Sequence, residues 1–231
     1  MMGFSDSSHF RKTLAGMCMV LTPVFALASW VVAPTPHTGE AAQLASIAAH
    51  PDRALWSALF AIAAISCGIG ATLGLMHMLR ERRPMHAGIG GVLAVIGLMT
   101  WLAATGVEMM LWSMTRDGVQ AADVSAFSNL RDSTGSAIVL YWLPLLSAIG
   151  LVTLAVGMQS AKVVDWWMAA MIGIAPVMLV IAGLTASAWV GIIGAAVMLV
   201  GLGSTGMMVL READADWEHT PDWRGFRPVA Q

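Results

Sequence analysis

Charged side chains are scarce in this sequence of 231 residues. They make up 11% of it, whereas soluble domains carry roughly a quarter, and hydrophobic residues make up 58%. A soluble protein of this size exposes more surface than so few polar groups can cover. The shortage of charge therefore excludes an ordinary soluble domain and indicates that lipid is the solvent. The net charge of −2, without a large basic cluster, argues against a nucleic-acid partner.

Cysteine and reaction motifs are also nearly absent. The two cysteines, Cys18 and Cys67, stand in apolar runs at estimated depths that differ by about 8–10 Å, at 1.5 Å of rise per residue. A disulfide needs Cα atoms within about 7 Å, so we expect two separate thiols. No CxxC pair, GxSxG elbow, P-loop or HExxH motif occurs. The sequence therefore favours a protein that is not an enzyme.

Long uncharged stretches dominate what is present, and a helix needs about 20 apolar residues to cross a bilayer. The first stretch is too long for a signal peptide and is expected to remain as a span. The 45 residues from 166 to 210 carry no charge and would exceed the membrane as one helix, so we expect a reversal at 185–188. The fold is predicted to be all-α, a single domain of six transmembrane helices, at 14–33, 54–79, 87–114, 136–158, 166–186 and 188–210, with a tail at 211–231.

Lysine and arginine predict the orientation, because they collect in cytoplasmic loops. With the N-terminus inside, nine of these residues are cytoplasmic, including Lys12, Arg80 and Arg211, and only Arg53, Arg116 and Arg131 face outward. We therefore expect a multi-pass protein of a bacterial cytoplasmic, or plasma, membrane with both termini cytoplasmic. Tryptophans near the expected span ends agree with this arrangement.

Two segments outside the spans carry structural signals. The first outer loop has Leu44, Ile47 and Ala48 at helical spacing, which predicts a short amphipathic helix over the bundle. In the second outer loop Asp123 is expected to be an N-cap. The tail contains three aromatic residues, Trp217, Trp223 and Phe226, which either dock on a protein surface or rest on the membrane.

Small residues predict where helices approach one another closely. In the second span they are Ser66, Gly70 and Gly74, and in the sixth span Gly201 and Thr205. Such spacing allows backbones in a membrane to pack together.

Glu108 is the strongest candidate site residue, because it stands well inside an apolar run. On a helix it shares a face with Trp101, Thr105 and Trp112. A charged carboxylate at the centre of a span costs about 2.5–3.5 kcal/mol, so Glu108 should face the bundle, a water cavity or a cation. Glu108 is either a protonatable or cation-binding group reached from outside, or a structural acid near the interface.

We favour the structural interpretation. In that position Glu108 could pair with one of the three outward arginines, Arg53, Arg116 or Arg131.

His77 and His86 are the weak candidates for a metal site. Both lie beside methionines near the cytoplasmic face, and thioether with imidazole suits copper. The chain has 18 methionines, however, so this neighbourhood is expected by chance. A bis-histidine haem site needs histidines at matching depth on facing helices, and only this pair comes near that requirement. We expect neither copper nor haem, and no cofactor apart from lipid contacts.

Three short segments, RKTLAG at 11–16, ASIAAHPDR at 45–53 and GVE at 106–108, resemble a group of uncharacterised bacterial integral membrane proteins with six spans. The similarity extends over most of the chain. The resemblance implies the six-helix fold and no catalytic activity.

Three functions remain open. The first is an accessory or scaffold subunit that packs against other membrane proteins or forms a homo-oligomer. The second is a small ion- or proton-coupled transporter or channel that uses Glu108. The third is a redox or metal-binding membrane subunit.

Overall fold

The computed structural model describes residues 4–212 and residue 217. Within these residues the chain is all-α, without a strand, as predicted. Six helical spans in this part are long and apolar enough to cross a membrane, which confirms the predicted number. They are His9–Val32, Pro51–Leu79, Pro84–Met114, Thr134–Ala161, Trp166–Thr185 and Ala188–Arg211. The bounds differ from the predicted ones by a few residues, mainly because the first four spans begin before the predicted first residue.

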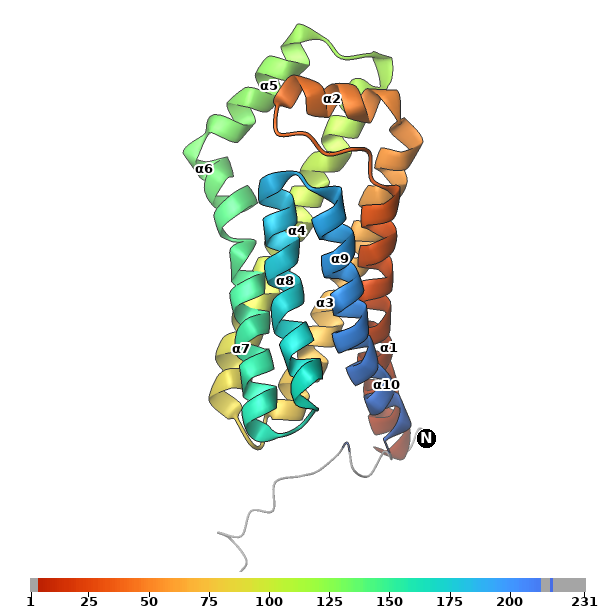
Figure 1. The fold of residues 1–231 in the computed structure, drawn as a ribbon, viewed down its shortest axis with the longest axis vertical. Coiled ribbons are helices and arrows are strands. Elements are labelled where there is room, and N and C mark those ends of the chain that lie inside the picture. Colours follow the sequence, from red (N-terminus) through yellow and green to blue (C-terminus); the bar gives the residue numbers. More distant parts are fainter. Residues whose placement is uncertain (1–3, 213–216, 218–231) are drawn as a thin grey trace, which may run out of the picture.

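The first three spans are single helices, and two of the last three are interrupted (Figure 1). The first three are α1 (Phe4–Val32), α3 (Pro51–Leu79) and α4 (Pro84–Met114). The fourth comprises α6 (Thr134–Ala137), the π-helical η2 (Ile138–Trp142) and α7 (Leu145–Ala161). The fifth is α8 (Trp166–Thr185), and the sixth comprises α9 (Ala188–Met198), the π-helical η3 (Leu199–Gly203) and α10 (Ser204–Arg211). The predicted reversal is confirmed: Ala186 adopts the left-handed conformation, with φ of 49°, and ends α8.

The spans form a ring in the order of the chain. Each packs against the next, from α1 and α3 through α4, α7 and α8 to α9, and the ring closes where α9 and α10 pack on α1. The interior is filled with apolar side chains rather than left as a channel. Met19, Leu75, Leu79, Leu154 and Met158 are at most 1% exposed and form the core.

Close backbone approaches hold this ring together. A Cβ atom on Gly97 of α4 would overlap the backbone of Ser147 in α7, and one on Gly150 would overlap Ala94. These positions therefore require glycine, because helices in lipid gain their stability from close packing.

The predicted packing residues lie mostly at helix contacts. Gly70 and Gly74 face α1, and Gly201 faces α8. Thr205 is completely buried. Ser66 is exposed instead. Residues four apart are rotated by about 40° beyond one helical turn, so a stripe with this spacing drifts away from the neighbouring helix.

Two helices cover one end of the ring, which we call the capped end. They are α2 (Glu40–Ala49) and α5 (Ala121–Asp132), and the short η1 (Thr115–Asp117) joins α4 to this region (Figure 1). Leu44 and Ile47 of α2 are buried against Leu111, which agrees with the predicted amphipathic helix. Asp123 was expected at the N-cap, but Gln120 occupies that position. Asp123 lies in the first turn and accepts a hydrogen bond of 2.9 Å from the backbone N–H of Gln120.

The opposite end, which we call the basic end, gathers most of the cationic residues. It contains the start of α1, the 80–83 turn between α3 and α4, Lys162 between α7 and α8, and the end of α10. The surface between the two ends is apolar, with Met99, Ile193 and Val200 exposed by 60%, 51% and 47%. Trp189 near the capped end and Trp166 near the basic end are 76% and 72% exposed, as in the aromatic belts of membrane proteins.

Cys18 and Cys67 were expected at different depths, and this expectation is wrong. Both are free thiols, and their side chains lie close to each other between α1 and α3. The relative shift of α1 and α3 along the bundle, which the sequence does not show, brings the two residues to similar depths.

Candidate functional site

Glu108 lies on the face of α4 that, closer to the basic end, contacts α7. Gly97 on this face meets Ser147, and Glu108 follows three helical turns later. Towards the capped end α4 and α6 diverge, and α5 joins them across the end of the bundle (Figure 1). The side chain of Glu108 is exposed, because the fourth span no longer covers this part of α4.

The predicted companions of Glu108 have different environments. Thr105 is 4% exposed, and its hydroxyl donates a hydrogen bond of 3.0 Å to the carbonyl of Trp101. The indole Nε1 of Trp112 is buried, and no described residue accepts its hydrogen bond. The guanidinium of Arg116 lies 5.4 Å from the centre of the Trp112 ring. Glu108, Trp112 and Arg116 thus follow one another at four-residue spacing on one face.

The three arginines that were expected to pair with Glu108 bond elsewhere. Arg53 donates hydrogen bonds of 3.0 Å to the carbonyls of Val32 and Ala33. Arg131 forms an ion pair of 2.9 Å with Glu40 in the cap. Arg116 lies over Trp112. Among the described residues, none of the three arginines forms an ion pair with Glu108.

Two unsatisfied polar groups consequently lie one helical turn apart. Within the described residues no hydrogen bond or ion pair is made by the Glu108 carboxylate, which can accept from a cationic side chain, bind a proton or hold a cation. An unpaired buried N–H such as that of Trp112 costs about 1–3 kcal/mol. A cation supplied by a ligand or partner would satisfy the exposed carboxylate of Glu108, whereas the indole N–H of Trp112 is buried within the protein.

His77 is engaged with the C-terminal segment. Its ring stacks on Trp217 at 4.5 Å between centroids, and its Nε2 lies 3.0 Å from the carbonyl oxygen of Trp217. Its Nδ1 lies 3.2 Å from Nη1 of Arg80. A guanidinium only donates, so Nδ1 accepts and Nε2 carries the proton that is donated to Trp217. Both ring nitrogens are therefore in use and do not point to a free ligand site.

His86 packs against α7, where a Cβ on Gly157 would come 2.8 Å from the Cβ of His86. Across the described segments, no three His, Cys, Asp or Glu side chains come close enough to hold a metal ion. The pair His77 and His86 thus gains no third ligand from the part of the chain that the structure describes.

The docking of Trp217 and the burial of Lys12 are features that sequence reasoning did not place. Trp217 is 7% exposed and joins the main core, which supports docking over a position on the membrane surface for this residue. Trp223 and Phe226 lie outside the described residues. The Nζ of Lys12 donates a hydrogen bond of 2.6 Å to the backbone carbonyl of Glu212. The position of Lys12 just before the first apolar run could have indicated that Lys12 is buried, but the same position is equally typical of an exposed charge that flanks a span.

Comparison with known proteins finds no match among family models, curated proteins or solved structures.

Proposed function

We propose that the protein is a non-enzymatic subunit of a membrane complex, located in a bacterial cytoplasmic membrane with both termini on the cytoplasmic side. It packs against another membrane protein through the Glu108 face, defined as Ala104, Glu108 and the adjoining surface of α4. The resemblance to uncharacterised six-span bacterial proteins is compatible with this role.

The observation that supports the proposal is the exposed and unpaired carboxylate of Glu108 within a span. A charged carboxylate within a span is costly, and such residues in membrane proteins normally pair with another group. A partner helix with a lysine or arginine at the same depth would remove this cost.

The buried polar groups favour a packing role over transport. The buried hydroxyls of Thr72, Thr105, Ser147 and Thr205 donate to carbonyls three or four residues earlier in their own segment. They are therefore satisfied within single helices, and these groups do not form a polar path across the described bundle.

Site-specific photo-crosslinking in native membranes tests the proposal. A benzoylphenylalanine at Ala104 lies one turn from Glu108 and leaves the carboxylate intact. We expect one discrete protein adduct, and we expect Glu108→Gln to reduce its yield at least tenfold, because truncating one member of a buried charge pair costs about 2–5 kcal/mol.

The same photoreactive residue at Ile193, which is 51% exposed on α9, is the matched control and should give no such adduct. The adduct mass identifies the partner class: about twice the chain mass of 24.3 kDa indicates a second copy, and any other protein mass indicates a different subunit. Adducts with lipid alone at Ala104 would refute the proposal.

A small proton- or ion-coupled transporter is the second candidate. The observation that favours it is the π-helical geometry of η2 and η3, since such segments often occur at functional sites. In that case purified protein in liposomes would show a proton- or ion-coupled flux that Glu108→Gln abolishes. The absence of flux with the wild-type protein would eliminate this candidate.

A further inference from the structure

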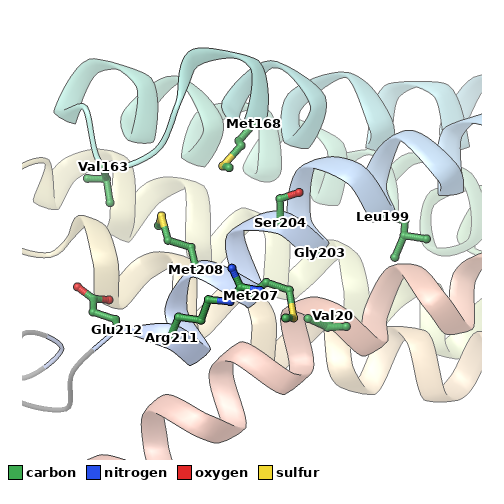
Figure 2. Close-up of a pocket in the computed structure, with 10 residues that line it drawn as sticks. All are labelled: Val20, Val163, Met168, Leu199, Gly203, Ser204, Met207, Met208, Arg211 and Glu212. Atoms are coloured by element: carbon green, nitrogen blue, oxygen red, sulfur yellow. The ribbon is translucent and has the colours of Figure 1, made fainter.

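An apolar groove runs along the sixth span near the basic end. Its lining comes from α1, from α8 and the turn before it, and from η3 and α10 (Figure 2). Its volume of about 870 Å³ lies within the range of small-molecule sites, about 300–1,000 Å³. Val20, Met168, Leu199 and Met207 line it with apolar surface, and Ser204 adds one hydroxyl.

The groove has the length of one membrane leaflet. Leu199 and Arg211 lie at its two ends and are twelve residues apart, which corresponds to about 18 Å of helix. Half of a hydrocarbon core of about 30 Å is about 15 Å. An acyl chain that follows the groove from the basic end would therefore end near the middle of the bilayer.

The sequence of α9–α10 explains why a groove exists here. The π-helical turn Leu199–Gly203 widens the helix locally, and Gly203 and Ser204 place little side-chain volume next to it. A regular helix with large residues at these positions would fill the space between α1 and α8.

The basic end of the groove carries an available cation. Arg211 is exposed, and within the described residues it forms no ion pair. Figure 2 shows its guanidinium turned into the groove beside Met207, whereas the carboxylate of Glu212 points away from it. A guanidinium at the membrane surface matches the phosphate of a lipid, which it can bind with two hydrogen bonds.

We propose that this groove binds one anionic phospholipid, with a phosphate at Arg211 and an acyl chain along Met207 and Leu199. Two properties of the groove select this occupant: the apolar length matches one leaflet, and the guanidinium of Arg211, which turns into the groove, lies at the headgroup level. Basic pockets between transmembrane helices bind lipid headgroups in a similar way, with cationic side chains at the level of the headgroup. This inference does not depend on the proposed function, because the groove and the Glu108 face lie at opposite ends of the bundle.

Native mass spectrometry of delipidated protein in mild detergent tests the proposal. The protein is titrated with dioleoyl phosphatidylglycerol, with dioleoyl phosphatidylcholine and with inorganic phosphate. We expect one phosphatidylglycerol to bind about tenfold more tightly than phosphatidylcholine, and Arg211→Gln to remove this preference. Inorganic phosphate should neither bind nor compete, because it makes no use of the apolar groove.

Two further variants separate the site from general effects. Arg83→Gln removes an exposed cation at the same end and should retain the preference for phosphatidylglycerol. Ser204→Phe fills the groove and should reduce the binding of both lipids at least tenfold, while Ser204→Ala should not.

The thermal unfolding of each variant without lipid shows that it is folded. Equal binding of phosphatidylglycerol by wild type and Arg211→Gln, or an equal loss in Arg83→Gln, would overturn the proposal. Lipid binding that is unaffected by Ser204→Phe would also overturn the proposal. The groove would then be a candidate contact surface for a partner helix instead.

Discussion

At the scale of single residues, Glu108 and Lys12 are accommodated in opposite ways. Lys12 is buried, and its ammonium group reaches the carbonyl of Glu212 at the basic end. Long basic side chains can extend to the membrane surface in this manner, and a glutamate is too short to do so. Glu108 therefore depends on what binds to its face of α4, and this is why it is the best candidate for function.

The two cysteines give a prediction at this scale. The thiols of Cys18 and Cys67 lie close together, so copper phenanthroline in native membranes should remove two hydrogens and form an intramolecular disulfide. Intact-mass analysis after alkylation would show a single species without alkylated thiols. Cys67→Ser is the control and should remain monomeric with one alkylated cysteine. Two alkylated thiols in the oxidised wild-type protein would contradict the contact between α1 and α3.

At the scale of elements, continuous and interrupted spans have different roles. The helices α1, α3 and α4 are continuous and form one side of the ring. The fourth and sixth spans contain π-helical segments, which are η2 at Ile138–Trp142 and η3 at Leu199–Gly203. The first accompanies the divergence of α6 from α4 that exposes Glu108, and the second opens the groove beside Arg211. Both candidate sites therefore arise where a span departs from regular α-helix.

The contact between α4 and α7 gives a prediction for elements. A methyl group at Gly97 would overlap the backbone of Ser147, so Gly97→Ala should lower the free energy of unfolding by about 1–3 kcal/mol. Unfolding of the purified protein by titration with dodecyl sulfate measures this change.

Gly88→Ala on the same helix is the matched control, because no atom lies within 4 Å of the added Cβ. It should leave the stability unchanged or raise it slightly, since alanine favours the helix. Equal stability of the two variants would show that α4 and α7 are not in close contact at Gly97.

At the scale of the whole molecule, the distribution of charge predicts the orientation. The spans form a closed ring with the cationic turns at one end and α2 and α5 at the other. Because cationic loops are retained on the cytoplasmic side, the basic end should face the cytoplasm.

Cysteine labelling measures this orientation. In a chain in which both native cysteines are alanine, Val119→Cys at the capped end should react with an impermeant maleimide in intact cells. Arg83→Cys in the α3–α4 turn should react only after the cells are permeabilised. The reverse pattern would show that the orientation is inverted.

The sequence by itself determined the six spans, their approximate bounds, the reversal near Ala186 and the amphipathic α2. These features follow from local hydrophobicity and length. Because the bilayer has a fixed thickness, an apolar segment of about 20 residues is expected to cross it as one helix. Glu108 could also be identified, because a charge within an apolar run is conspicuous in any single sequence.

Only the tertiary structure decided what surrounds these residues. It gave Arg53, Arg116 and Arg131 partners other than Glu108, brought Cys18 next to Cys67, and placed Trp217 against His77. Such contacts depend on the relative rotation and shift of helices that are distant in the sequence. In lipid, the rotation and shift of helices are set by small differences in side-chain packing rather than by hydrophobicity. The pattern of apolar residues therefore does not predict these contacts.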